Sequence, residues 1–360
     1  MRPTRLLAVC LALMWSCALP LESTAAADPS AHLRRLAARE QAEFERRGLI
    51  LSDARLSAYL SDVVVRLWAH VDSPLEKPCF GVLLDNGLDA HAYPGGSCYL
   101  TTGMLDVVAS EDQLAMILGH EIVHYVCRHA ARIYAYLHQS GNRGGSGRAD
   151  PGPVVAAAEN QADRDGLALM LKAGYCGQEV LPLMSRLMTG ATVRHGAVEQ
   201  TVQQLARRRA RMEALLDEMS PGPACAPQAP HGPGAFSDRI APALIANARI
   251  AVRLGDWGQA EHSIARYLEV RPEHAEAHCI KGDILRRKAA GHADDRGAAC
   301  YKKAIAIDPR LAMAHRALGE LYYKDGRFED AITHFEAFIG LAPRDATIDY
   351  VKGYLDQCRH

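Results

Sequence analysis

The chain has 360 residues, of which 49% are apolar and 23% are charged, a composition that excludes a wholly disordered protein and predicts roughly two domains. Its 41 basic and 42 acidic residues give a formal charge of −1, which argues against a strongly basic nucleic-acid-binding protein. Aromatic residues make up only 6%, and this scarcity favours helices over a β-sandwich.

The first 27 residues have the three-part pattern of a secretory signal peptide. Arg2 and Arg5 precede an apolar run over residues 6–21, and a small-residue cleavage site follows at 25–27. A membrane anchor is the alternative, but the run is short and lacks a stop-transfer flank, and lipidation at Cys17 is less favoured still. We therefore expect a mature chain in the periplasm or outside the cell, without a transmembrane segment.

Helices and two short strands are predicted for the part of the chain that follows. Helical patterns cover 31–47, 53–70, 111–138, 155–173, 178–189 and 197–219, and strand patterns cover 79–85 and 97–102. We assign the two strands to one hairpin. Cys79 and Cys98 flank this hairpin and are the most favoured disulfide pair, because an oxidising compartment permits such bonds. The predicted fold is therefore mostly α with a small β-hairpin or sheet.

A change in composition marks the boundary between two expected domains. Residues 220–234 are rich in Pro and Gly, which is typical of a linker. We therefore expect a first domain over 28–240 and a second domain over 241–360.

The second domain is predicted to be a repeat array. Three segments end at Pro272, Pro309 and Pro343, which are 37 and 34 residues apart. The last segment has the tetratricopeptide pattern, carried by Leu318, Gly319, Tyr322, Ala331 and Phe335. About three repeats and a capping helix near 345–357 would form an α-solenoid, because each helix pair buries its apolar face only against a neighbour. An ordinary helical bundle is the alternative.

A metal-binding motif lies within the helical stretch 111–138. His120 and His124 are four residues apart, so both imidazoles leave the same helix face and can bind one ion. Zn²⁺ accepts such nitrogen ligands and keeps a position open for water. Glu121 is placed to take a proton from that water as it attacks a carbonyl. The alternative is two buried histidines beside a surface glutamate.

A third ligand is expected from the next helix. Glu159 and Asp163 are four residues apart and share one face of the helix predicted over 155–173. One carboxylate can bind the ion, and the other can hold a ligand histidine by its second nitrogen. An exposed acidic face is the alternative, and it would be preferred if the His-Glu-x-x-His motif were absent.

These motifs resemble the gluzincin zinc metallopeptidases of the HtpX and BepA type, over about residues 50–240. The resemblance rests on His-Glu-x-x-His, on Glu-x-x-Ala-Asp-x-x-Gly at 159–166 and on Ala-Gly-Tyr at 173–175. It also includes Ala-x-Ala-Tyr-Pro-Gly-Gly at 90–96 and Thr-Gly-Met-Leu at 102–105. The tetratricopeptide tail makes periplasmic proteases of the BepA type the nearest comparison.

The resemblance implies a zincin-type metallopeptidase domain with one Zn²⁺ per chain. It assigns His120, His124 and Glu159 as the zinc ligands, Glu121 as the catalytic base and Asp163 as a supporting carboxylate.

Three other histidines can be compared with the same family pattern. His129 matches a family position, but a continuous helix would put it near the face opposite His120, so we interpret it as structural. BepA-type proteins have a histidine in a Thr-His-Pro context that gates the zinc. His231, in Pro-His-Gly-Pro, resembles a degraded version and is predicted to gate access or to help hold the oxyanion, with an inert loop histidine as the alternative. His195 is less favoured.

A strand next to the metal is the predicted substrate-binding element. We expect Gly95, Gly96, Ser97, Cys98 and Tyr99 to form an edge strand that pairs with an extended peptide. A covered hairpin strand is the alternative.

The sequence therefore predicts a secreted zinc endopeptidase that hydrolyses peptide bonds with a metal-activated water and Glu121 as general base. Its expected partners are polypeptide substrates, with envelope or outer-membrane assembly proteins docking on the repeats, and no nucleic acid. By resemblance, it would act in envelope protein quality control or assembly. The alternative is a tetratricopeptide chaperone or adaptor whose zinc site is structural or latent. The intact set of ligands and base argues against that alternative, because a purely structural site does not need Glu121.

Overall fold

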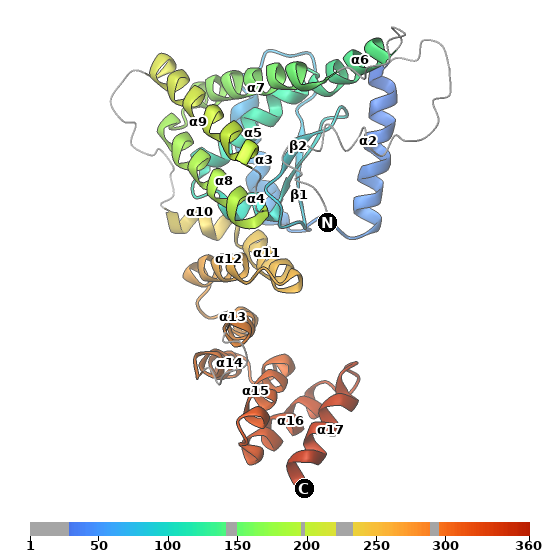
Figure 1. Cartoon of the computed structure of the whole chain (residues 1–360), viewed down its shortest axis with the longest axis vertical. Coiled ribbons are helices and arrows are strands. Elements are labelled where there is room, and N and C mark those ends of the chain that lie inside the picture. The colour runs from blue at the N-terminus through green and yellow to red at the C-terminus, as the bar shows by residue number, and fades with distance from the viewer. Residues whose placement is uncertain (1–28, 142–149, 196–198, 221–232, 289–294) are drawn as a thin grey trace. The chain divides into compact units, whose positions relative to one another are not determined.

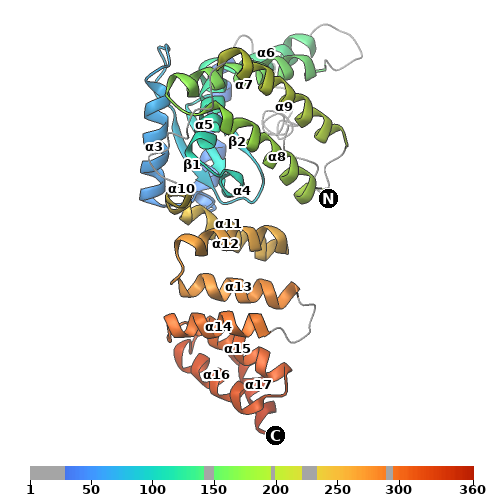
Figure 2. The same cartoon turned by 90° about the vertical axis from the view of Figure 1, so that its left-hand side faces the viewer.

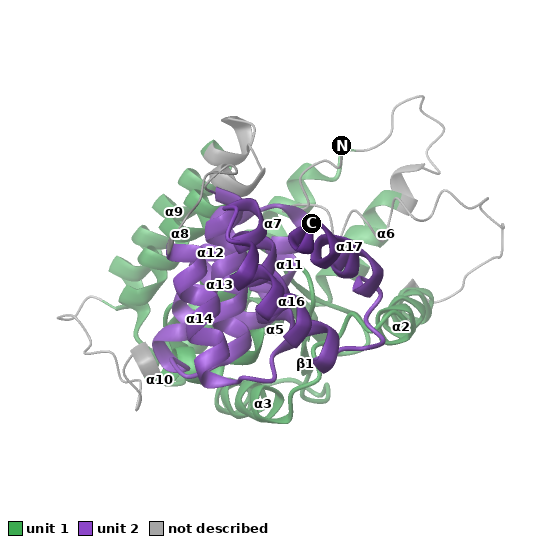
Figure 3. Cartoon of the chain, turned by 90° about the horizontal axis from the view of Figure 1, so that it is seen from below, with its two compact units in different colours: residues 1–243 green, residues 244–360 purple. Residues whose placement is uncertain are grey.

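The computed structural model of the chain describes residues 29–141, 150–195, 199–220, 233–288 and 295–360 (Figure 1). The expected signal peptide and His231 therefore lie outside the described residues. The chain divides into two compact units, the first ending at Ala243 and the second spanning Leu244–His360 (Figure 3). The prediction of a mostly helical chain with a small sheet is confirmed.

Among the described residues, no helix is both long enough and apolar enough to span a bilayer.

Helices surround a small sheet in the first unit. They are α2 (Pro29–Arg46), α3 (Ala54–Trp68), α4 (Thr102–Val107), α5 (Glu111–Val126), α6 (His129–Gly141), α7 (Gly152–Lys172), the short 3₁₀ helix η2 (Gly177–Glu179), α8 (Val180–His195), α9 (Glu199–Met219) and α10 (Pro233–Arg239). Side-chain caps define several starts: Asp53 accepts a hydrogen bond from the backbone of Leu56, and Ser110 does the same for Gln113. Such caps satisfy amides that have no partner in the first turn.

The sheet has three strands in the order β1-β3-β2, formed by Cys79–Leu83, Ser97–Thr101 and Ala90–Ala92 respectively. β3 pairs with β1 in parallel and with β2 antiparallel. The predicted hairpin of 79–85 with 97–102 is therefore wrong. The chain between the two strands returns through β2, so β1 and β3 run in the same direction.

The expected Cys79–Cys98 disulfide is also wrong, because both thiols are free. Cys79 is opposite Ser97, and Cys98 is opposite Phe80, so the two cysteine side chains point to opposite faces of the sheet. Cys79 is exposed and Cys98 is buried. Cys176 is instead disulfide-bonded.

The helix predicted over 111–138 is broken into α5 and α6. α5 ends at Val126, and Arg128 adopts a left-handed backbone conformation with φ of 52°. Residues other than glycine are uncommon in this conformation, so the chain changes direction here before α6 begins at His129.

Helices α5 and α7 cross at a backbone-to-backbone contact in the first unit. A Cβ atom added to Gly166 would lie 2.9 Å from the backbone nitrogen of His120, and one added to Gly119 would lie 3.1 Å from the carbonyl oxygen of Gly166. Two glycines therefore let the helices approach closely enough for the side chain of His120, on α5, to meet those of α7.

The second unit is a stack of helices that follow one another in chain order (Figure 2). They are α12 (Trp257–Val270), α13 (Ala275–Lys288), α14 (Asp295–Ile307), α15 (Ala312–Lys324), α16 (Phe328–Leu341) and α17 (Ile348–Arg359), with α11 (Ala241–Leu254) across the unit boundary. Within the pairs, the ring of Tyr301 packs on Gly282 and that of Phe335 packs on Gly319. Their shared core continues through Val351 and Leu355 of α17.

Candidate metal centre

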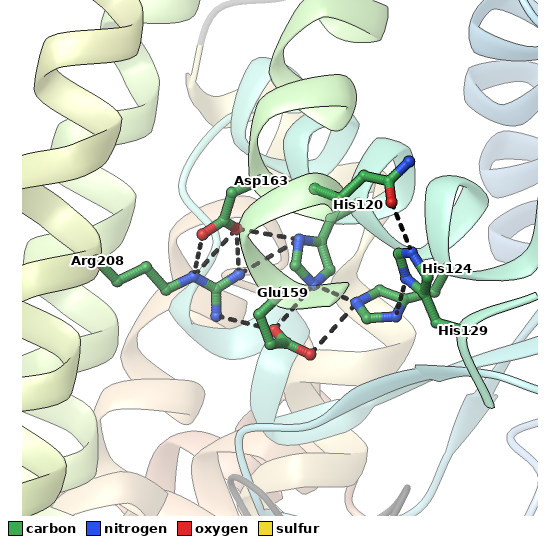
Figure 4. Close-up of polar contacts among 7 residues, drawn as sticks. His120, His124, His129, Glu159, Asp163 and Arg208 are labelled. Atoms are coloured by element: carbon green, nitrogen blue, oxygen red, sulfur yellow. Dashed lines mark hydrogen bonds and ion pairs between the residues drawn. The ribbon is translucent and has the colours of Figure 1, made fainter. Parts of the chain in front are cut away.

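Three predicted ligands meet where α5 crosses α7 (Figure 4). The Nε2 atoms of His120 and His124 are 3.0 Å apart. The two carboxylate oxygens of Glu159 lie 3.5 Å and 3.4 Å from these nitrogens. One ligand atom from each residue falls within a 4.8 Å cluster. Two imidazole nitrogens and one carboxylate oxygen are a donor set that suits Zn²⁺ with one position left open.

The charges in this cluster are strongly coupled. Burial alone would lower the pKa of His120, but hydrogen bonds to Asp163 and Glu159 raise that pKa to about 10. Burial and the neighbouring His120 lower the pKa of His124 to about 3. Burial would raise the pKa of Glu159, but its hydrogen bond to His120 and the charges of His120 and Arg208 keep that pKa well below its usual value. The ionised carboxylate of Glu159 therefore faces both imidazoles.

Asp163 and Arg208 hold the outer nitrogen of His120. Asp163 Oδ1 lies 3.1 Å from His120 Nδ1. The guanidinium of Arg208, on α9, donates to both oxygens of Asp163 at 2.5–3.0 Å and lies 3.8 Å from Glu159. Burial raises and these contacts lower the pKa of Asp163, which ends at about 2. Asp163 thus stays ionised and orients the His120 ring toward the cluster.

Sequence reasoning missed Arg208. It is one of several arginines in the stretch 203–212, and their number concealed it. A usable signal existed, however, because Arg208 lies on the same helix face as Leu205, Met212 and Leu216, all of which are buried. A charge on the apolar face of a helix indicates a buried partner.

Glu121 is buried next to the cluster and contacts β2. Its side chain is only slightly exposed, and burial raises its pKa to about 7 against the lowering effect of His120. The backbone amide of Ala92 donates to the Glu121 carboxylate. This contact ties the expected base to the sheet.

The predicted edge strand is wrong. Ser97, Cys98 and Tyr99 belong to β3, which is the central strand of the sheet, with β1 on one side and β2 on the other. Gly95 and Gly96 lie in the turn before it. β3 has no free edge for a peptide, because it pairs with β1 along one edge and with β2 along the other. The outer strand that reaches α5 is β2.

The predictions for the three histidines outside the motif have different results. The prediction that His129 lies on the opposite helix face is wrong: the break at Arg128 turns it back, so that its Nδ1 lies 3.0 Å from Nδ1 of His124. His195 ends α8, and its side chain lies outside the described part of the chain. His231 is not among the described residues, so its role stays a prediction.

Comparison with known families decides the class of the chain. Residues 54–141, which include His120, Glu121 and His124, match peptidase family M48. Residues 245–291 match a tetratricopeptide repeat family and residues 298–326 match a second one. The chain carries a peptidase family M48 domain followed by tetratricopeptide repeats. Both parts of the expected resemblance are thereby confirmed, and the second unit is a repeat solenoid rather than an ordinary bundle.

Each of the curated relatives matches only part of the chain. The Beta-barrel assembly-enhancing protease of Escherichia coli (strain K12) is 24% identical over 168 residues, which are 39% of this chain and 34% of the relative. The Mitochondrial metalloendopeptidase OMA1 of Schizosaccharomyces pombe is 35% identical over 78 residues, covering 22% of this chain and 23% of the relative. The Tetratricopeptide repeat-containing protein trd-1 of Caenorhabditis elegans is 33% identical over 103 residues, covering 28% of this chain and 12% of the relative. The matches thus span about a third or less of each relative's length.

Proposed function

We propose that the chain is a zinc-dependent endopeptidase that hydrolyses peptide bonds in other polypeptides. The observation that carries this proposal is the approach of two imidazole nitrogens and one carboxylate within 4.8 Å, beside the buried carboxylate of Glu121. The M48 match over the same helix supports it. His120, His124 and Glu159 would hold one Zn²⁺.

When bound, zinc supplies a Lewis acid that polarises a carbonyl and makes water more acidic. The chain's own residues do the remaining work. The Glu121 carboxylate accepts a proton from the attacking water and returns it to the leaving amine nitrogen. Asp163 keeps the His120 ring oriented through Nδ1, and Arg208 keeps Asp163 ionised. Glu121 is preferred as base because Glu159 and Asp163, the two other acidic residues at the cluster, both contact His120.

Substrate would lie along β2 rather than β3. A cavity of about 60 Å³ lies beside His124 and is lined in part by Ala92, Tyr93, Pro94 and Tyr125. An extended peptide can pair with the outer side of a strand by main-chain hydrogen bonds, which bind many sequences with little selectivity. His231 would gate this entrance or contact the oxyanion.

The repeats would recruit partners, and the relatives suggest which kind. By analogy with the Beta-barrel assembly-enhancing protease, we propose envelope or outer-membrane assembly proteins as partners and an envelope quality-control role. The first 27 residues would be removed on export, which leaves a metallopeptidase domain over 28–240 and a repeat domain over 241–360 in the periplasm or outside the cell.

The decisive experiment separates the base from the ligands. Glu121→Gln in the full chain should lower casein cleavage about a thousandfold while zinc content stays at one per chain, because the three ligands are intact. Glu218→Gln, at an exposed site on α9, is the matched control and should cleave like the wild type. Removal of zinc with a chelator should abolish cleavage, and added zinc should restore it. Cleavage that survives either change would overturn the proposal.

The repeat matches favour a second candidate function, a chaperone or adaptor with a structural zinc site. That function predicts no zinc-dependent cleavage by the wild type and partner binding that is unchanged in Glu121→Gln.

A further inference from the structure

The turn between α5 and α6 gives His124 a buried partner. Because Arg128 breaks the helix, His129 returns toward α5 and is 1% exposed. Its Nδ1 lies 3.0 Å from His124 Nδ1, on the side of the His124 ring that faces away from His120 and Glu159 (Figure 4). His129 therefore acts on His124 and not on the metal position.

The other nitrogen of His129 meets an amide whose orientation is defined. His129 Nε2 lies 3.3 Å from Gln161 Oε1, and Arg132 Nη1 approaches the same oxygen at 3.5 Å. Gln161 Nε2 lies 3.3 Å from Cys127 Sγ, which can accept a weak hydrogen bond. A guanidinium has donors and no acceptor, so the Gln161 atom that faces Arg132 must be the carbonyl oxygen.

This orientation determines the proton positions one step at a time. Gln161 Oε1 can only accept, so His129 Nε2 must carry a hydrogen. A neutral imidazole has one N–H, which leaves His129 Nδ1 as an acceptor. His124 Nδ1 must then donate, and His124 Nε2 keeps its lone pair. That lone pair is the one that faces His120 Nε2 and Glu159.

We propose that Arg132, Gln161 and His129 form a positioning relay that holds His124 in the Nδ1–H tautomer, the form that can bind a metal through Nε2. The relay rests on the metal site of the proposed function. His129 contacts His124 at the ring nitrogen that does not face the metal position, and Gln161 and Arg132 lie behind His129, so all three are positioning residues. The two ligand histidines are thus prepared differently: an ionised carboxylate holds His120, whereas a chain of neutral groups that ends at an arginine holds His124.

Zinc affinity of the full chain tests the relay without reference to proteolysis. We would measure it by competition with a zinc chelator at constant pH. His129→Phe should bind zinc 10–100-fold more weakly, as is typical when the partner of a metal-ligating histidine is lost. Gln161→Met should bind about three- to tenfold more weakly. Gln161→Glu keeps an acceptor oxygen and should bind as tightly as the wild type or more tightly. Ile133→Val, at the buried contact of α6 with α7, is the packing control and should lie within twofold.

Imidazole ¹⁵N spectra of the zinc-loaded chain provide a second readout that packing alone would not change. The wild type should have an Nδ1–H on His124 and an Nε2–H on His129, and Gln161→Met should mix the two His129 tautomers. If His129→Phe does not fold, Gln161→Met still tests the relay. Gln161 is only half-buried, so this variant should fold.

The outcomes separate this inference from the proposed function. Normal zinc binding by the wild type together with unchanged affinity in Gln161→Met and His129→Phe would overturn the relay alone. An Nδ1–H on His129 in the wild type would do the same. A wild-type chain that binds no zinc would overturn both the relay and the metal site.

Discussion

The two units both use glycine to bring helices together, but the neighbour of the glycine differs. In the first unit, a Cβ on Gly166 would lie 2.9 Å from the backbone nitrogen of His120. In the second, a Cβ on Gly319 would lie 2.7 Å from the ring of Phe335, and one on Gly282 would lie 2.5 Å from the ring of Tyr301. Displacing a ring disturbs mainly the packing around that side chain, whereas a helix backbone cannot move without taking its side chains along. The α5–α7 spacing is therefore rigid where the ligands meet, and the repeat spacing is more tolerant.

The two units also differ in how far apart in the sequence their contacting buried residues lie. The network of the first unit links His120, Asp163 and Arg208, which lie on three different helices well separated in sequence. The core of the second unit joins each helix mainly to the next, as Gly319 and Phe335 do. A repeat array is close to a sum of neighbouring interfaces, so local damage stays local there. Damage in the first unit should spread to the site.

The largest expected effect comes from breaking the ion pair between Arg208 and the buried Asp163. Arg208→Met should lower the free energy of unfolding of the first unit by about 3 kcal/mol, because the buried Asp163 carboxylate loses its guanidinium hydrogen bonds and keeps only the contact with His120. Urea unfolding with zinc removed measures it. Arg207→Met, at the exposed neighbouring position, should change stability by less than about 0.5 kcal/mol. Equal losses in the two variants would contradict the assigned pair.

A smaller effect is expected from the helix crossing. Gly166→Ala should destabilise the first unit by about 2 kcal/mol and weaken zinc binding about tenfold, because the new methyl group pushes α7 away from His120. Gly340→Ala, in α16 with open space around it, should instead stabilise its helix by about 0.5 kcal/mol. Wild-type zinc affinity in Gly166→Ala would show that the crossing does not control the site.

The units also differ in how their partly buried histidines are paired, which predicts an effect of pH on stability. Among the partly buried histidines, His315 and His334 of the second unit contact each other through Nδ1 atoms 3.0 Å apart, whereas both ring nitrogens of His91 in the first unit lack a hydrogen-bond partner. Tyr93 and Tyr99 pack around His91, and the Asp89 carboxylate is 3.9 Å from its Nδ1. Burial lowers the pKa of His91 to about 4.

The direction of the pH effect on stability depends on the unfolded state, in which His91 has a pKa near its ordinary value of about 6.5. As the pH falls from 7 to 5, His91 is protonated in the unfolded chain but not in the folded chain. The free energy of unfolding therefore decreases on acidification. His91→Phe should remove up to about 2 kcal/mol of that loss in the first unit. Urea unfolding at pH 7 and pH 5 measures it, and an unchanged difference between the two pH values would refute the assignment.

The smallest effect should come from the repeats. Gly319→Ala should destabilise the second unit by about 1 kcal/mol, because the new methyl group displaces the ring of Phe335 and leaves the helix backbones in place. Zinc affinity and casein cleavage should stay at the wild-type level. A loss of zinc affinity would mean that damage in the repeats does reach the first unit.

Local periodicity accounts for what the sequence predicts correctly. A helix places residues four apart on one face, so the spacing alone pairs His120 with His124 and Glu159 with Asp163. The repeat pattern at Gly319 and Phe335 has the same origin, because the contact lies within one helix pair. The strand segments can also be recognised from their residues, but their pairing cannot.

The sequence by itself therefore determined the helical class, the repeat array and the candidate ligand faces. Only the tertiary structure decided that β1 and β3 run in parallel, that β2 is the outer strand, and that Arg208 and His129 reach the two ligand histidines. The physical reason is the distance along the sequence over which the interactions act. Which side chains share a face depends on a few neighbouring residues, whereas which faces meet depends on helix breaks such as the one at Arg128 and on close approaches such as the one at Gly166.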